Sequence, residues 1–183
     1  EDTAVNVEKL PEYMADFQKI LDQYQLQCVF HAHIGSGELH LRPILNLKDP
    51  EDVRMFRTIG IEIAQLVKKY KGSLSGEHGD GRVRGEFIPL ILGEKNYQLL
   101  REIKNTWDPN HILNPGKIID VPPVTRNLRY EPGRETRQID TVFDFSNAGG
   151  IVRATEKCNG SGDCRKTEKA GGTMCPSYMA TRN

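Results

Sequence analysis

The chain has 183 residues with 25 basic and 25 acidic side chains, so its formal net charge is zero. A neutral chain presents no overall field to a polyanion, which leaves general binding to nucleic acid or to an anionic membrane without support. No run approaches the roughly 18 apolar residues of a membrane span, and no signal-peptide pattern precedes the helical pattern near Glu1. We therefore expect a fragment of a larger, cytoplasmic protein.

Residues 1–120 contain the apolar periodicity of a folded domain. Pro11, followed by apolar residues at helical spacing, predicts a helix over residues 8–25. Alternating runs over residues 27–34 and 39–45, separated by a glycine-rich turn, predict a β-hairpin. The apolar stripe of the helix is expected to cover one face of this hairpin.

The next segments extend the same pattern. Asp49-Pro50 starts a second predicted helix, which runs to Gly72. A short strand is expected over residues 72–75, then a glycine-rich loop over 77–85 and a third helix that ends at Trp107. This order predicts an α+β fold, namely a ferredoxin-like α/β sandwich with an antiparallel sheet and helices on one face.

The composition changes after residue 120. Residues 121–150 contain prolines and arginines with little apolar periodicity, which predicts an extended connector. Residues 151–183 form a cysteine-rich, mostly irregular tail, and its three cysteines lie too close together for the pattern of a secreted disulfide framework. A reducing compartment with a metal or cluster site is the better interpretation.

Three histidines and one glutamate could form a metal site. His31 and His33 share a face of the first strand, and the turn brings His40 of the second strand back beside His33. Half-buried histidines bonded to the backbone would give the same pattern. Glu77, in a loop with three glycines, adds a carboxylate, and two imidazoles with one carboxylate leave a coordination position open, as catalytic metal sites do.

Three motifs carry a family resemblance: HIGSGELH at residues 33–40, GEHG at 76–79 and DPNHILNPGK at 108–117. In this order they resemble the C-terminal domain of the FAD-linked oxidases, which include D-lactate, glycolate and D-2-hydroxyglutarate dehydrogenases. The resemblance covers nearly all of residues 1–120. Two positions depart from the family pattern, because Ser36 replaces an acidic residue and Glu38 replaces an asparagine.

The resemblance implies a role for several side chains. His33, His40 and Glu77 would bind a divalent metal, zinc or manganese, and Glu77 would thereby contribute to cofactor binding. His78 would be the catalytic base that accepts the proton of the substrate hydroxyl, although a purely structural role in the loop is the alternative. Asn114 would face the flavin of FAD, whose glycine-rich binding domain lies upstream in this family.

Arg42 is a further candidate catalytic-site residue. It lies two residues after His40 on the same strand face, where its guanidinium could bind a substrate carboxylate. A solvated arginine at the sheet edge would give the same pattern.

The tail carries a second resemblance. Residues 158–165 and 172–178 resemble the opening of an iron–sulfur module that is fused to one branch of these flavoproteins. Cys158, Cys164 and Cys175 would then be ligands of a 4Fe-4S cluster, with the fourth thiolate further along the polypeptide. A zinc knuckle or three free thiols are the alternatives.

Together these features predict a fragment of an FAD-dependent oxidoreductase that oxidises a D-2-hydroxy acid of the D-lactate or D-2-hydroxyglutarate class. It would need the missing FAD-binding domain and the remainder of the iron–sulfur region, and it would pass electrons to an unidentified acceptor that could sit at a membrane. Two alternatives remain open: a zinc-dependent hydrolase using His31, His33 and His40, and a non-catalytic electron-transfer or interaction module.

Overall fold

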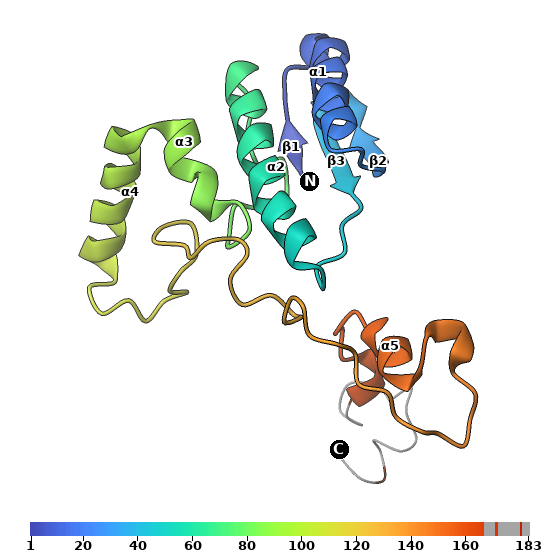
Figure 1. Ribbon diagram of the computed structural model, residues 1–183. Coiled ribbons are helices and arrows are strands. Elements are labelled where there is room, and N and C mark those ends of the chain that lie inside the picture. Colours follow the sequence, from blue (N-terminus) through green and yellow to red (C-terminus); the bar gives the residue numbers. More distant parts are fainter. Residues whose placement is uncertain (167–170, 172–179, 181–183) are drawn as a thin grey trace. The chain divides into compact units, whose positions relative to one another are not determined.

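A computed structural model of the chain describes residues 1–166, 171 and 180 (Figure 1). The chain divides into two compact units, Glu1–Arg134 and Glu135–Asn183. The division falls inside the connector that the sequence predicts for residues 121–150. The first unit combines helices with an antiparallel sheet, which confirms the α+β class.

The sheet has three described strands, β1 (Thr3–Ala4), β2 (Cys28–His33) and β3 (Glu38–Pro43), in the order β1-β3-β2. Both pairings are antiparallel, and the predicted hairpin is β2 with β3. The strand expected over residues 72–75 is reduced to one bridge, between Ala4 and Ser73, because β1 is only two residues long. A ferredoxin-like topology remains a prediction.

The hairpin turn requires a glycine at position 37. A short 3₁₀ helix, Ile34–Ser36, leads into Gly37, whose φ of 77° lies in the left-handed region. A Cβ atom on this residue would lie 1.9 Å from the carbonyl oxygen of Val5. Any side chain here would therefore push β3 away from the segment that follows β1.

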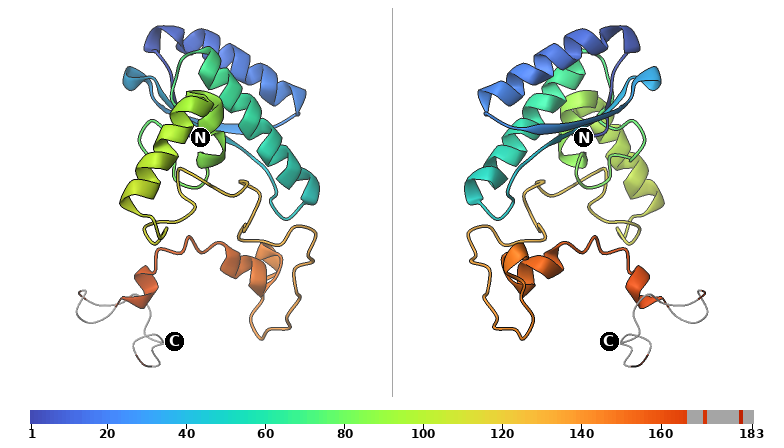
Figure 2. Two further views of the ribbon diagram at one scale, coloured as in Figure 1. Left: turned by 90° about the vertical axis from the view of Figure 1, so that its left-hand side faces the viewer. Right: turned by 90° about the vertical axis from the view of Figure 1, so that its right-hand side faces the viewer.

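Two long helices, α1 (Leu10–Gln23) and α2 (Pro50–Lys69), match the first two predicted helices (Figure 2). Asp49 caps α2, because its side chain accepts a hydrogen bond from the backbone N–H of Glu51 at 2.8 Å. The third predicted helix is α4 (Glu94–Trp107). The five-residue helix α3 (Ile88–Leu92) precedes it and was too short to predict from periodicity.

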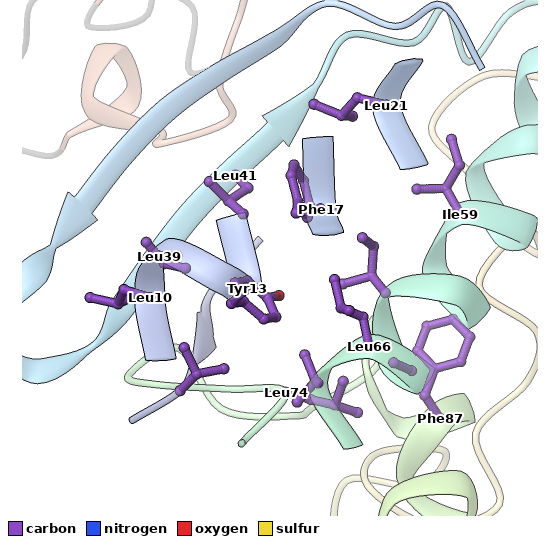
Figure 3. Packing of buried hydrophobic residues seen from close by; sticks show 14 of the residues in the cluster. Leu10, Tyr13, Phe17, Leu21, Leu39, Leu41, Ile59, Leu66, Leu74 and Phe87 are labelled. Atoms are coloured by element: carbon purple, nitrogen blue, oxygen red, sulfur yellow. The ribbon is translucent and has the colours of Figure 1, made fainter. Parts of the chain in front are cut away.

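The core of the first unit lies between the sheet and the two long helices (Figure 3). Tyr13 and Phe17 of α1 and Leu66 of α2 pack in one cluster with Leu39 and Leu41 of β3. Full burial of such a side chain stabilises the fold by roughly 1.5–3 kcal/mol. Since side chains alternate along a strand, the even-numbered residues of β3 project from the opposite face of the sheet.

The second unit contains less regular structure. Its described elements are α5 (Ile151–Glu156) and two 3₁₀ helices, Ser146–Ala148 and Asp163–Arg165. Val142 and Phe143 are exposed. Across the described part of both units, every helix is too short or too polar to cross a bilayer.

Candidate active site

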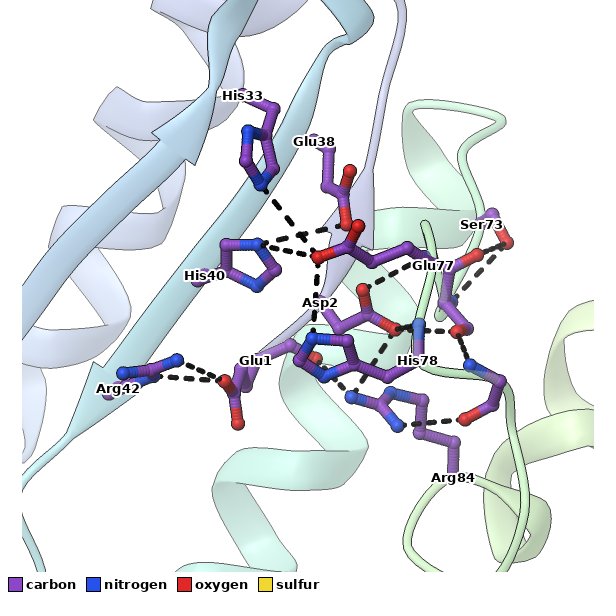
Figure 4. Close-up of polar contacts among 12 residues, drawn as sticks. Glu1, Asp2, His33, Glu38, His40, Arg42, Ser73, Glu77, His78 and Arg84 are labelled. Carbon is purple, nitrogen blue, oxygen red and sulfur yellow. Dashed lines mark hydrogen bonds and ion pairs between the residues drawn. The ribbon is translucent and has the colours of Figure 1, made fainter.

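Histidines from β2 and β3 gather on the sheet face opposite the helices (Figure 4). The strand register places His31 opposite His40, and His33 opposite Glu38. The expected neighbour of His40 was His33, which is instead its diagonal partner, with ring centroids 5.2 Å apart. His40 is buried, at 3% exposure, whereas His31 and His33 are exposed.

The loop after Ser75 brings two more side chains to these histidines. Oε1 of Glu77 lies 3.4 Å from Nε2 of His40, 3.4 Å from Nε2 of His78 and 3.7 Å from Nε2 of His33. The His78 ring also stacks on the His40 ring, with centroids 5.1 Å apart. The structure therefore brings together four residues that the sequence singled out, around one carboxylate oxygen.

A fully buried carboxylate, that of Asp2, holds this loop in place. It accepts hydrogen bonds from the backbone N–H groups of Glu77 and His78, at 3.0 and 3.1 Å, and from the Ser75 hydroxyl. Burial alone would raise the pKa of Asp2, but these hydrogen bonds outweigh it and hold the pKa well below its ordinary value. Asp2 is a positioning residue that the sequence analysis missed.

Arg84 completes the attachment of the loop. Its guanidinium donates to the carbonyl oxygens of Gly79, at 2.9 Å, and Glu1, at 3.1 Å, and lies 3.4 Å from Oδ2 of Asp2. The side chain is largely buried, so this charge balances the buried carboxylate of Asp2. The loop geometry thus depends on a segment that is more than seventy residues away in the sequence.

Arg42 lies next to the histidine cluster at the edge of a pocket of about 480 Å³. Its guanidinium forms an ion pair with Glu1, with Nη2 2.8 Å from Oε1, and about half of the side chain is exposed. Arg42 and His78 both line the pocket, and most of the remaining lining is apolar, including Phe56, Ile59 and Phe87. The predicted carboxylate-binding residue and the predicted base therefore border the same cavity.

Glu38 adds a second carboxylate to the cluster. Its Oε1 lies 3.8 Å from Nε2 of His40, and the potential ligand atoms of His33, Glu38, His40 and Glu77 all lie within 4.8 Å of one another. Four ligands about 2.0–2.2 Å from a tetrahedral zinc ion are roughly 3.3–3.6 Å apart, so the set needs only small side-chain movements to hold a divalent cation. The residues present therefore fit a metal.

The surroundings of Glu38 disfavour its charged form. Burial raises the pKa of Glu38, and a hydrogen bond to the Asp2 carboxylate and the negative charge of Glu77 raise it further. Oε1 of Glu38 is buried without a hydrogen-bond partner among the described residues. Such an acceptor is costly to bury. The only sequence signal for Glu38 was its departure from the family pattern.

Asn114 lies in a different loop, the one that follows α4. Asp108, which is almost fully buried, accepts hydrogen bonds from the backbone N–H groups of Ile112 and Leu113 at 3.0 and 2.9 Å. Its ion pair with Lys104 is the main cause that lowers the pKa of Asp108 to about 2. Asn114 itself is exposed, and the structure shows no contact between it and the described site residues.

The predicted cluster ligands lie in the second unit. Cys158 and Cys164 are exposed and form no disulfide. The backbone N–H of Gly160 donates to Sγ of Cys158 at 3.4 Å. Cys175 lies outside the described residues, so the three-cysteine set is untested.

Comparisons with known proteins give a consistent result. Residues 1–118 match the family described as "FAD linked oxidases, C-terminal domain". Over its whole length the chain is 39% identical to a D-2-hydroxyglutarate dehydrogenase of Pseudomonas putida and 36% identical to one of Escherichia coli, and it covers 18% of each. A mitochondrial D-lactate dehydrogenase [cytochrome] of Arabidopsis thaliana is 32% identical over 64% of this chain, which covers 21% of that relative. The chain spans about a fifth of the length of these relatives.

Proposed function

Because the chain belongs to the FAD-linked oxidases, whose C-terminal domain forms its residues 1–118, we propose that it is part of an enzyme that oxidises a D-2-hydroxy acid. The observation that carries the proposal is the position of Glu77 Oε1, 3.4–3.7 Å from the Nε2 atoms of three histidines. Relatives named D-2-hydroxyglutarate dehydrogenase match the whole chain, which favours that substrate over D-lactate.

His33, His40 and Glu77 would hold a divalent cation, zinc or manganese, at this point. When bound, such a cation supplies Lewis-acid polarisation that lowers the pKa of the substrate hydroxyl. The two imidazoles come from neighbouring strands and the carboxylate from a loop anchored by Asp2. The sheet and a buried carboxylate therefore preorganise the three ligands.

His78 would accept the hydroxyl proton at Nε2, which lies 3.4 Å from the carboxylate of Glu77. A histidine can be neutral near pH 7 and therefore ready to accept a proton. Its backbone N–H is bound by Asp2 and its ring stacks on His40, so both restrict the orientation of the base. The flavin of the family would supply the two-electron acceptor, with Asn114 proposed to face it.

Arg42 would bind a carboxylate of the substrate through its guanidinium. Among the described residues Arg42 pairs with the exposed Glu1, whose carboxylate a substrate carboxylate can replace. The apolar lining of the adjoining pocket would accommodate the methylene chain of a dicarboxylate such as 2-hydroxyglutarate. Arg42 would then contribute to substrate binding more than to the chemical step.

We further propose that Cys158, Cys164 and Cys175 bind part of a 4Fe-4S cluster that receives electrons from the flavin. Support comes from the resemblance of residues 158–165 and 172–178 to the opening of an iron–sulfur module fused to some of these flavoproteins. The flavin domain, the fourth thiolate and the electron acceptor would come from outside this chain.

The zinc hydrolase remains the weaker proposal. His31, His33 and His40 do have ligand atoms within 4.8 Å of one another. Membership of the FAD-linked oxidases favours the dehydrogenase, because that family transfers electrons to a flavin. The two proposals differ in the reaction they expect for a 2-hydroxy acid, which is oxidation in one and none in the other.

Steady-state assays of the intact protein with D-2-hydroxyglutarate, D-lactate and an artificial electron acceptor test the proposal, together with elemental analysis. We expect His40→Ala to lose both the metal and the activity, while Glu94→Gln, a change on the exposed surface of α4, alters neither. Unchanged metal content and kcat in His40→Ala would show that the histidine cluster is structural.

A further inference from the structure

The geometry points to a fourth protein ligand in this site: we propose that Glu38 binds the divalent cation directly, beside His33, His40 and Glu77. The inference rests on the metal site proposed above and adds to it one of the two residues by which this chain departs from the family pattern. The site would then contain two imidazoles and two carboxylates.

The position of Glu38 relative to the His40 ring shows whether Glu38 can bind the metal itself or can only orient His40. A carboxylate that only orients a metal-binding histidine contacts the ring nitrogen that faces away from the metal. Oε1 of Glu38 instead lies 3.8 Å from Nε2 of His40, the same nitrogen that Oε1 of Glu77 approaches to 3.4 Å. The other ring nitrogen, Nδ1, is buried with no hydrogen-bond partner among the described residues. Glu38 is therefore on the metal side of His40.

The burial of Glu38 gives an independent argument. Its side chain is only 10% exposed, and Oε1 has no hydrogen-bond partner among the described residues although it points at the cluster (Figure 4). An acceptor buried in this way costs free energy unless something satisfies it. A cation between Glu38 and Glu77 would satisfy it and would also offset the repulsion between the two carboxylates.

The loop leaves room for Glu38 in this position. A Cβ atom on Gly76 would lie 2.7 Å from Cγ and Cδ of Glu38, a distance that real side chains do not reach. The absence of a side chain at position 76 thus lets the Glu38 carboxylate reach the cluster. Gly76 immediately precedes Glu77, so both carboxylates depend on the same turn.

A second carboxylate changes which cation the site prefers. Two carboxylates neutralise the charge of a divalent ion, and oxygen ligands suit manganese, whereas imidazoles suit zinc. We therefore expect Glu38 to raise the affinity for Mn²⁺ more than the affinity for Zn²⁺. A purely structural glutamate would affect both metals equally.

The experiment compares metal binding in the intact protein with that of Glu38→Gln, which keeps the shape of the side chain and removes its charge. Titrations with Mn²⁺ and with Zn²⁺ alone give both affinities, and the Mn²⁺ EPR spectrum reports the ligand set. Mutation of a residue that only supports a metal ligand typically lowers metal affinity by roughly 10–100-fold. Because Glu38 would be a ligand itself, we expect Glu38→Gln to lower the Mn²⁺ affinity by at least that much. The Zn²⁺ affinity should fall less.

Controls separate failure of this inference from failure of the metal site itself. Glu94→Gln removes one surface charge and should bind both metals like the parent protein. If Glu38→Gln keeps both affinities while His40→Ala loses them, Glu38 is no ligand and the three-residue site stands. If His40→Ala also keeps both, the proposed site is wrong as well. If circular dichroism shows that Glu38→Gln does not fold, Glu38→Asn, which introduces the family residue, is the second variant.

Discussion

Two irregular loops carry most of the sequence motifs, and each is held by one buried aspartate. Asp2 binds the backbone of the loop over residues 75–85, and Asp108 binds that of the loop over residues 108–118. Asp2 reaches backbone groups 75 and 76 residues away, whereas Asp108 reaches groups only 4 and 5 residues away. The hydrogen bonds that anchor the first loop therefore depend on tertiary folding, whereas those of Asp108 join residues that are close in sequence. The two loops also meet, because the backbone N–H of Ile118 donates to the carbonyl oxygen of Gly81 at 2.8 Å.

The electrostatic partners of the two aspartates differ in the same way. Asp2 is balanced by the largely buried guanidinium of Arg84, and the loop it holds carries Glu77 and His78. Asp108 is balanced by Lys104, one turn earlier in α4. A change in the first loop should thus affect both the stability of the fold and the reaction, while loss of the Asp108 contacts should mainly affect residues 108–113.

The largest expected effect is on the rate, from the side chain carried by the first loop. His78→Ala should lower kcat by roughly 10²–10⁴-fold, because it removes the proposed general base. His111→Ala, the same change in the second loop, should lower kcat by much less. Steady-state kinetics with D-2-hydroxyglutarate measures both, and equal effects would remove the functional distinction between the loops.

The next largest effect is expected at Asp2. Asp2→Ala leaves two backbone N–H groups and the Arg84 guanidinium without their buried partner, and breaking such a pair costs about 3–5 kcal/mol of unfolding free energy. Urea denaturation followed by far-UV circular dichroism measures the loss.

A double-mutant cycle sharpens this prediction. Because Asp2→Ala leaves a buried charge unpaired, the double variant with Arg84→Met should lose less stability than the sum of the two single variants. Strict additivity would mean that Asp2 and Arg84 do not interact, and that the first loop is held by its hydrogen bonds alone.

A smaller effect is expected at Asp108. Asp108→Asn removes the ion pair with Lys104 and weakens the acceptor for the Ile112 and Leu113 amides. Hydrogen exchange should accelerate at these two amides while the amides of Glu77 and His78 keep their protection. Accelerated exchange in both loops would contradict the local character of the Asp108 contacts.

The smallest expected effect is a decrease of the unfolding free energy at acidic pH. Both aspartates have a folded-state pKa below the ordinary value of 3.8, and that of Asp108 is about 2. Their contribution to the unfolding free energy is thus fully present above pH 3.8 and is lost as the pH falls through the folded-state pKa values. Urea midpoints measured from about pH 5 to pH 2 should fall less steeply in Asp108→Asn than in the parent protein, and parallel curves would refute the assignment.

The sequence predicted the elements whose signals are local. The helices near residues 8–25 and 50–70, and the hairpin of β2 and β3, follow from periodicities that each segment carries within itself. The same periodicity put His31, His33 and His40 on one sheet face. The detailed pairing of His40 depended on the register of the turn, which the spacing alone did not define.

The missed features depend on contacts between distant segments. β1 is two residues long and has no periodicity, so neither the strand nor the anchoring role of Asp2 was predictable. Glu38 was visible only as a departure from a family motif, because its burial beside His40 depends on the close approach of Gly76. Local patterns therefore predicted the members of the site better than the residues that position them.

The chain's single tryptophan has a spectroscopic consequence. Trp107 is the last residue of α4, next to Asp108, and is 82% exposed. Its indole is already in water in the folded chain, so its emission should lie at long wavelength and change little when the core unfolds. A blue shift on addition of another protein or domain would instead report that this end of α4 becomes covered. Trp107 is thus an intrinsic fluorescent probe for association rather than for folding.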